Sequence, residues 1–136
     1  MTLGALVAHK AEAAGVGSAG TPAALVATAP GALVRQALGL MRLHDVSQLP
    51  VLDGDVRVGS VTEQFLTTRS LESTRFLDAT VGEVMDEPFP TVGAEEPADA
   101  VTKLLSKATP ALLVAEAGRV VGIVTRGDML QFLMAR

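Results

Sequence analysis

Apolar residues in the first half of the chain follow first a strand-like and then a helical pattern. Residues 25–28 (Leu-Val-Ala-Thr) form a short apolar run that ends before Pro30-Gly31, which predicts a strand followed by a turn. Beyond the turn, apolar positions recur at helical spacing and place Val34, Ala37, Leu38 and Met41 on one face. The pattern predicts a strand and then an amphipathic helix.

Two further apolar runs follow this helix. Residues 48–52 and 56–62 flank Asp53-Gly54-Asp55, a strong signal for a hairpin turn. After Thr62, apolar positions return to helical spacing through Phe65 and Leu66. The first half is therefore predicted to fold as β-α-β-β-α.

The second half repeats this order. Residues 89–92 form the short strand, Pro97 suits a first helical position, and the apolar face of the next helix comprises Val101, Leu104, Leu105 and Ala108. Runs at 111–115 and 119–125 flank Glu116-Ala117-Gly118. The last predicted helix carries Met129, Leu130, Leu133 and Met134.

A repeated motif relates the two halves. Gly59-Ser60-Val61-Thr62 and Gly122-Ile123-Val124-Thr125 lie 63 positions apart. The same offset, without a gap, also matches Thr28 with Thr91, Ala37 with Ala100, Leu49 with Leu112, Val51 with Val114 and Val58 with Val121. Such self-similarity indicates two supersecondary units that complete one core. We predict an α+β fold of tandem β-α-β-β-α repeats with pseudo-two-fold symmetry.

The predicted boundaries divide the chain into four parts. They are an N-terminal helix or linker (1–21), a first repeat (22–71), a polar connector (72–80) and a second repeat (81–136). The N-terminal part is rich in Ala and Gly, and suits a short helix that stops near Gly15 or Gly17 before a flexible joint. It is either a linker from a lost upstream domain or a helix docked on the repeats.

Composition excludes several classes of function. With 136 residues, 49% of them hydrophobic, the chain can bury a core, while a net charge of −4 and 3% aromatic residues disfavour nucleic-acid binding. There is no Cys, and no apolar run approaches the roughly 18 residues of a membrane span. The N-terminus lacks the basic region of a secretory signal, so we expect a cytoplasmic protein.

Motifs for catalysis or metal binding are missing from the sequence. His9 and His44 lie far apart without acidic metal-ligand spacing, and neither a nucleophile elbow nor a glycine-rich phosphate loop occurs. We therefore expect no catalytic residue, no metal ligand and no required cofactor.

The repeated motifs resemble a known family. An apolar-Pro-apolar strand (residues 49–53), a short hairpin and Gly-apolar-Val-Thr at a helix start, all duplicated, resemble the CBS domain pair, or Bateman module, over roughly residues 22–136. Residues 81–85 look like the family's entry to its second domain. More narrowly, residues 46–51 and 122–130 are similar to the C-terminal regulatory region of cystathionine β-synthase. The pyridoxal-phosphate-dependent part of that enzyme is absent, which leaves an excised fragment or a free-standing relative.

The resemblance implies an adenosine-binding cleft between the repeats. In this family the motif Gly-x-x-Thr-x-x-Asp holds ribose, because a carboxylate can accept hydrogen bonds from both vicinal hydroxyls. Only the second copy fits, with Thr125 and Asp128; the first has Phe65 at the Asp position, so one competent site is expected. The site residues that the resemblance implies are Thr125, Asp128 and Ile123 from the second repeat and Gln48, Val46, Ser47 and Ala27 from the first.

Two functional interpretations stay open. The favoured one is a regulatory module that binds an adenosyl effector and controls a catalytic partner domain or subunit by reorienting the repeats. S-adenosylmethionine is favoured through the enzyme resemblance, and AMP or ATP are alternatives. The other is a ligand-free dimerisation scaffold with occluded clefts, in which Thr125 and Asp128 only cap a helix. A homodimer is expected in both.

Overall fold

The computed structural model describes residues 2–14, 25–106 and 109–134. The chain divides into a first unit, Val26–Pro88, and a second unit that joins Phe89–Arg136 to the N-terminal residues Met1–Leu25. None of the described helices is both long and apolar enough to cross a membrane.

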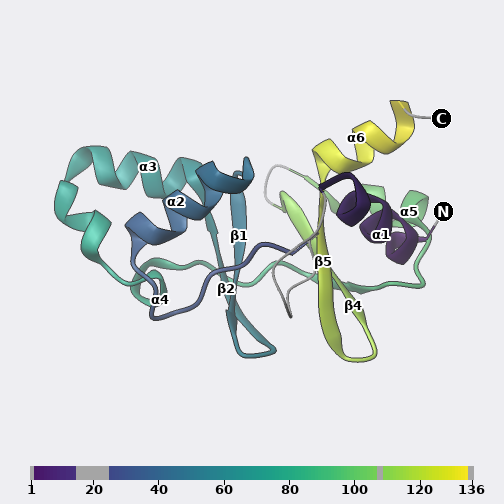
Figure 1. The fold of residues 1–136 in the computed structure, drawn as a ribbon, viewed down its shortest axis with the longest axis horizontal. Coiled ribbons are helices and arrows are strands. Elements are labelled where there is room, and N and C mark those ends of the chain that lie inside the picture. Colours follow the sequence, from purple (N-terminus) through teal and green to yellow (C-terminus); the bar gives the residue numbers. More distant parts are fainter. Residues whose placement is uncertain (1, 15–24, 107–108, 135–136) are drawn as a thin grey trace. The chain divides into compact units, whose positions relative to one another are not determined.

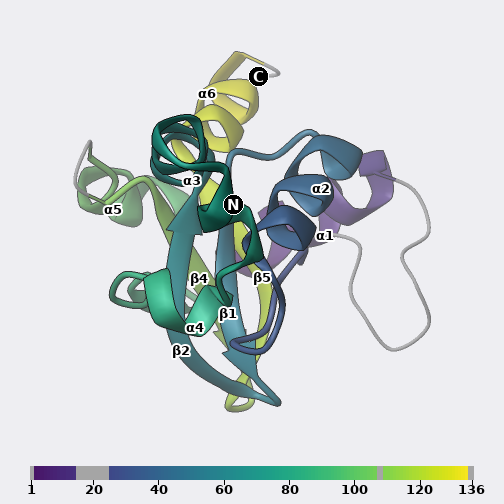
Figure 2. The ribbon, with the colours of Figure 1, turned by 90° about the vertical axis from the view of Figure 1, so that its left-hand side faces the viewer.

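In the first unit, helices cover one face of a hairpin (Figures 1 and 2). Its elements are α2 (Val34–His44), β1 (Gln48–Asp53), β2 (Val56–Thr62), α3 (Glu63–Glu72), the 3-10 helix η1 (Thr74–Asp78) and α4 (Val81–Val84). Strands β1 and β2 pair antiparallel. The buried core consists of Val34, Ala37, Met41, Leu49, Val51, Val61, Leu66 and Val81.

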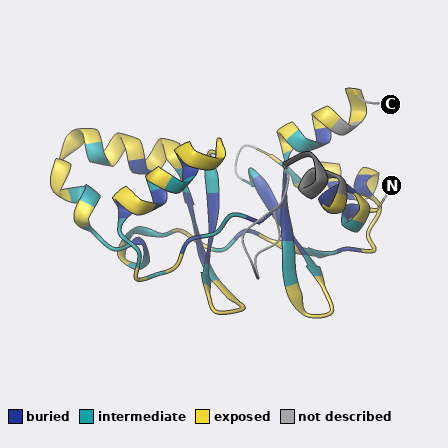
Figure 3. Cartoon of the chain, viewed as in Figure 1, coloured by how far each residue is buried: buried dark blue, intermediate teal, exposed yellow. Residues whose placement is uncertain are grey.

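The second unit contains a three-stranded sheet in the order β3-β4-β5. Its elements are α1 (Leu3–Ala14), β3 (Thr91–Gly93), α5 (Ala98–Val101), the 3-10 helix η2 (Thr102–Leu104), β4 (Ala111–Glu116), β5 (Arg119–Thr125) and α6 (Arg126–Met134). In both units burial is concentrated on the strands and on the inward helix faces (Figure 3). The predicted α+β class is confirmed, and the second repeat has the predicted β-α-β-β-α order, whereas the first has only helix-strand-strand-helix in α2, β1, β2 and α3.

The first predicted strand of each repeat needs correction. Residues 25–28 contribute only one parallel bridge, in which the Thr28 N–H donates to the Pro50 carbonyl (3.0 Å) and the Thr28 carbonyl accepts from the Leu52 N–H (2.9 Å). The turn at Pro30-Gly31 follows at once and leaves no room for a longer ladder. In the second repeat the strand is Thr91–Gly93, later than residues 89–92.

Strand pairing shows that the repeats are not related by a single offset. Thr28 pairs with Val51, but Val114, the counterpart of Val51, pairs with Val92. Thr28 therefore corresponds to Val92, 64 positions later, whereas the hairpins keep the offset of 63. The predicted matches of Thr28 with Thr91 and of Ala37 with Ala100 are wrong, and the second repeat is one residue shorter between its first strand and its hairpin.

The shorter connection coincides with a shorter helix. The predicted helix through Ala108 ends in the structure as α5 and η2, with Leu104 51% exposed; Ala108 itself lies outside the described residues. The Thr102 hydroxyl bonds back to the Ala98 carbonyl (3.1 Å), an interaction that competes with continued helix. By contrast, α2 runs 11 residues and ends at His44, and Asp45 caps it in the left-handed conformation.

A helix from outside each β-α-β-β-α repeat packs on it. In the second unit α1 docks through backbone bonds from Leu3 to Glu96 (2.8 Å) and from Gly4 to Ala94 (2.8 Å). This supports the docked-helix interpretation of the N-terminal segment for residues 2–14; Gly15 and Gly17, where the helix was expected to stop, lie outside the described residues.

Helix α4 has the same role in the first unit. Val81 donates to Ala32 (2.8 Å) and Gly82 to Pro30 (2.9 Å), and Val81 is fully buried in the first core. The sequence boundary placed residue 81 at the start of the second repeat, yet residues 81–88 pack with the first unit. Each repeat thus receives the helix that precedes the other repeat in the sequence.

The glycine of each repeated motif makes room for this added helix. A methyl group built on Gly122 would lie 2.6 Å from Cγ1 of Val7 in α1, and one built on Gly59 would lie 2.5 Å from the sulfur of Met85, just beyond α4. Both distances are shorter than a carbon contact allows. The motif glycines are therefore required by close packing.

We expect Gly122→Ala to lower the free energy of unfolding by about 2 kcal/mol, because the new methyl overlaps the branched Val7 side chain. Val7→Ala should recover part of this loss, giving a coupling energy of about 1–2 kcal/mol in a double-mutant cycle measured by urea denaturation. The control is Gly39→Ala in the interior of α2, where a methyl group meets no atom within 4 Å. Strictly additive effects of the Gly122 and Val7 substitutions would contradict this packing.

The second hairpin turn holds a residue in an unfavourable conformation. Ala117 (φ 53°) and Gly118 (φ 79°) connect the paired residues Glu116 and Arg119. Alanine at positive φ costs about 1 kcal/mol, and Asn-Gly is the preferred pair where both turn residues have positive φ. We expect Ala117→Asn to raise stability by about 1 kcal/mol in thermal denaturation, and Gly118→Ala to lower it. A loss with Ala117→Asn would contradict this turn.

Candidate functional site

The second motif forms a reciprocal cap where β5 meets α6. The Thr125 N–H donates to Oδ2 of Asp128 (2.9 Å), and the Asp128 N–H donates to the Thr125 hydroxyl (3.2 Å). Both residues are half-buried. The capping role anticipated for them is therefore present.

Capping and ligand binding can coexist at Asp128. A carboxylate offers about four acceptor positions on two oxygens, so the bond to Thr125 uses only part of its capacity. The carboxylate also lies in the first turn of α6, where the helix dipole favours negative charge. Arg126 and Gly127 beside it are exposed. The arrangement presents an oriented carboxylate with a cation close by in the sequence.

Ile123 can contribute little through its side chain. It is 5% exposed in β5 and packs with Phe89, Ala111 and Leu113. Among the second-repeat candidates, Thr125 and Asp128 carry the polar chemistry.

The first motif has lost half of this cap. The Phe65 N–H donates to the Thr62 hydroxyl (3.3 Å), but Phe65 has no acceptor to return the bond. Its ring packs edge-on against Phe76 at 6.2 Å, and the Arg69 guanidinium lies over both rings. An aromatic cluster thus replaces the carboxylate.

The other first-repeat candidates lie between α2 and β1. The Val46 N–H bonds to the Met41 carbonyl (2.9 Å), and the Ser47 carbonyl accepts from the first residue of α3, Glu63 (2.9 Å). The Ser47 hydroxyl lies 3.1 Å from Oε1 of Gln48, which pairs with Thr62 across the hairpin. These bonds hold Val46, Ser47 and Gln48 beside the start of α3.

The candidates therefore form two sets. Thr125, Asp128 and Ile123 belong to the second unit, and Ala27, Val46, Ser47 and Gln48 belong to the first. That both sets face one ligand stays a prediction.

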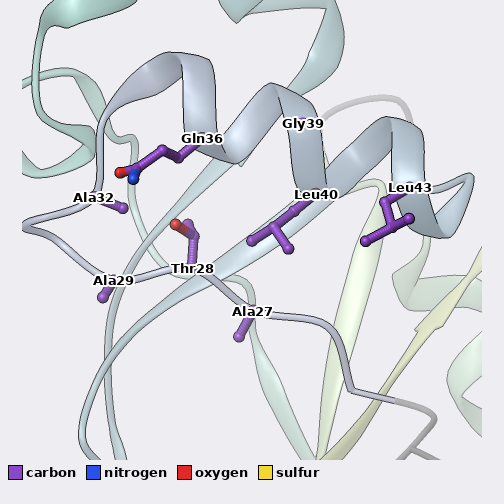
Figure 4. A pocket seen from close by; sticks show the side chains of 8 residues that line it. All are labelled: Ala27, Thr28, Ala29, Ala32, Gln36, Gly39, Leu40 and Leu43. Carbon is purple, nitrogen blue, oxygen red and sulfur yellow. The ribbon is translucent and has the colours of Figure 1, made fainter. Parts of the chain in front are cut away.

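The first unit contains a pocket that the sequence did not predict (Figure 4). It has a volume of about 680 Å³ and lies between residues 27–32 and α2. Only Ala27 among the candidates lines it. The available signal was Thr28, a polar residue that ends an otherwise apolar run.

A second pocket, of about 730 Å³, lies in the second unit between α6 and the residues that follow the short helix α5. It is lined by η2, the residues after η2 and α6, and its lining includes Leu105, Arg126 and Leu133. The described residues bring together no group of three His, Asp or Glu side chains that could hold a metal ion.

Comparison with known proteins identifies the second repeat. Residues 81–135 match the family model of the CBS domain. This segment is a CBS domain. The whole chain has the fold of CBS-domain proteins: it superimposes on a CBS-domain-containing protein from Agrobacterium tumefaciens with a TM-score of 0.77, at 20% identity, over 98% of this chain and 99% of that one. At this identity the likeness concerns the fold alone.

A plant CBS-pair protein is also similar. CBSX2 from Arabidopsis thaliana is 27% identical, with a TM-score of 0.68, over 82% of this chain and 86% of CBSX2. CBSX2 has also been solved in complex with AMP, and this structure matches with a TM-score of 0.66 at 27% identity, over 82% of this chain and 88% of CBSX2. These findings confirm the predicted resemblance to CBS-pair proteins; the narrower resemblance to cystathionine β-synthase stays a prediction.

Proposed function

We propose that this CBS pair is a regulatory module that binds one adenosyl ligand per chain. The observation that carries the proposal is the asymmetry of the two motifs. Thr125 and Asp128 form a complete polar pair at the start of α6, whereas Thr62 is followed by the apolar Phe65 at the start of α3. A ribose diol needs acceptors, and only the second motif supplies a carboxylate.

In this proposal Asp128 accepts hydrogen bonds from the ribose hydroxyls and the Thr125 hydroxyl adds a partner. Gln48 reads the edge of the base through its amide, Val46 packs on the base, and Ser47, Ile123 and Ala27 complete the surroundings. The AMP complex of CBSX2 supports an adenosyl ligand.

Ligand identity depends on the group attached to the adenosine. Arg126 is exposed in the first turn of α6 and suits a phosphate, which favours AMP or ATP. S-adenosylmethionine carries a cation and no phosphate; the resemblance to the regulatory region of cystathionine β-synthase favours it. The proposal concerns the adenosyl group that all three compounds share. One experiment compares binding of the three.

Regulation requires that the ligand bind one arrangement of the repeats more tightly than another. A cytoplasmic homodimer that passes this preference to a partner domain or subunit fits the proposal. The second candidate function, a dimerisation scaffold, is favoured by exposed apolar side chains on α3 and α6: Leu71 (83%), Met134 (76%) and Leu130 (57%).

Thermal denaturation with S-adenosylmethionine, AMP and ATP separates the two functions. A ligand at about a hundredfold excess over its dissociation constant should stabilise the folded chain by about 2.7 kcal/mol. At least one of the three should raise the melting temperature. If none of them changes the melting temperature, and light scattering shows the chain to be a dimer, the dimerisation scaffold would be supported instead.

A further inference from the structure

The pocket beside α2 in the first unit is built differently from the proposed adenosyl site. Its lining residues are Ala27, Thr28, Ala29, Ala32, Gln36, Gly39, Leu40 and Leu43. Val46, Ser47 and Gln48 are not among them, and Ala27 is the residue that both sites include. Its volume of about 680 Å³ falls within the range of roughly 300–1,000 Å³ that is usual for small-molecule sites.

Thr28 gives the pocket an unsatisfied polar group. The residue is only 7% exposed, and its hydroxyl is buried without any hydrogen-bond partner. Figure 4 shows its side chain directed toward α2, between Gln36 and Leu40, while the methyl groups of Ala27 and Ala29 point the opposite way. Buried hydroxyls nearly always have a partner, so this one requires an explanation.

The second unit shows what a purely structural residue looks like at this position. The counterpart of Thr28 is Val92, which has nearly the same shape without the hydroxyl and packs against the second core. Ala32 corresponds to Glu96, because each carbonyl accepts a backbone bond from the helix docked on its unit. The first unit thus has a small residue at the position of this charged one, and a hydroxyl at the position of Val92.

The lining defines the chemistry of the ligand. It contains no charged side chain, and Leu40 and Leu43 supply apolar surface. Gln36 accepts the Leu33 N–H through Oε1 (2.8 Å), so its amide nitrogen is the group left to donate at the pocket edge. We propose that this pocket binds an uncharged, largely apolar small molecule whose carbonyl or hydroxyl group pairs with Thr28.

Acetophenone is a suitable probe because it joins a neutral carbonyl to an apolar ring, and ethylbenzene is its matched hydrocarbon. Titration into the full chain, followed by methyl NMR, should perturb the methyl groups of Ala32, Leu40 and Leu43. A ligand of this size should bind in the millimolar range. An excess of AMP, or the Asp128→Ala substitution, should leave this binding unchanged, which separates it from the proposed adenosyl site.

Two variants test the pocket directly. Thr28→Val reproduces the second-unit residue and should weaken acetophenone about fivefold to tenfold while leaving ethylbenzene unaffected. It should also raise the melting temperature, since it removes an unsatisfied hydroxyl. Gly39→Leu fills the pocket from a position where a Cβ meets no atom within 4 Å, and should abolish binding of both probes.

Arg42→Leu, on an exposed part of α2 outside the lining, is the control and should bind like the parent chain. Absence of localised perturbation by acetophenone, or perturbation that survives Gly39→Leu, would overturn the pocket. Equal acetophenone affinity in Thr28→Val and the parent chain would overturn the role of the hydroxyl.

Discussion

Replacing Leu3 by alanine is expected to lower the free energy of unfolding of the second unit by about 3 kcal/mol. Leu3 is completely buried, although it lies at the start of the chain, and it packs in one cluster with Leu112, Val114 and Met129. Truncation would leave a cavity beneath α1 and remove one of the largest apolar contacts between this helix and the sheet. Urea denaturation followed by circular dichroism measures the loss.

The matched control is Leu43→Ala. Leu43 is 77% exposed on α2, so the same truncation there should change stability by less than about 0.5 kcal/mol. A Leu3 variant as stable as the Leu43 variant would mean that α1 contributes nothing to the second unit.

Asp128→Ala is expected to weaken binding of the adenosyl ligand at least about a hundredfold. Hydrogen bonds to a charged group contribute about 1.5–3 kcal/mol each, and this carboxylate is proposed to accept two from the ribose. The variant also loses the bond from the Thr125 N–H, so its stability should fall by about 1 kcal/mol. Isothermal titration calorimetry and thermal denaturation measure the two effects separately.

Asp128→Asn distinguishes binding from capping. Its amide oxygen can still accept the Thr125 N–H, so stability should be largely kept, whereas a neutral amide replaces the charged acceptor and binding should remain weak. If Asp128→Ala bound the ligand as well as the parent chain, Asp128 would be a cap and nothing more.

Local patterns in the sequence predict most elements well. The hairpins follow from apolar runs around Asp53-Gly54-Asp55 and Glu116-Ala117-Gly118, and α2 follows from the spacing of Val34, Ala37 and Met41, all of which are buried. These features depend on neighbouring residues and on a periodicity that burial enforces.

Features that depend on long-range pairing escaped prediction. The change of offset from 63 to 64 emerges only when Thr28 and Val92 are paired with their strands, because a single missing residue in a connection leaves each local pattern intact. The sequence does contain a signal for the docking of α1 on the second unit and of α4 on the first. Thr2-Leu3-Gly4 and Thr80-Val81-Gly82 are related tripeptides, and they dock in the same way on opposite units.

The same distinction between local and long-range features applies to the candidate site. The asymmetry between Phe65 and Asp128 is visible in the sequence, since it depends on one position in a repeated motif. The pocket at Thr28 is not, because an unsatisfied hydroxyl is recognised only when its surroundings are known.

Calorimetric titration of the full chain with S-adenosylmethionine, AMP and ATP tests the central claim most directly, because it counts sites. We expect saturable binding of at least one compound with a stoichiometry of one ligand per chain, since only the second motif carries the carboxylate. Two equivalent sites per chain, or no binding heat with any of the three, would contradict a single adenosyl site built on Asp128.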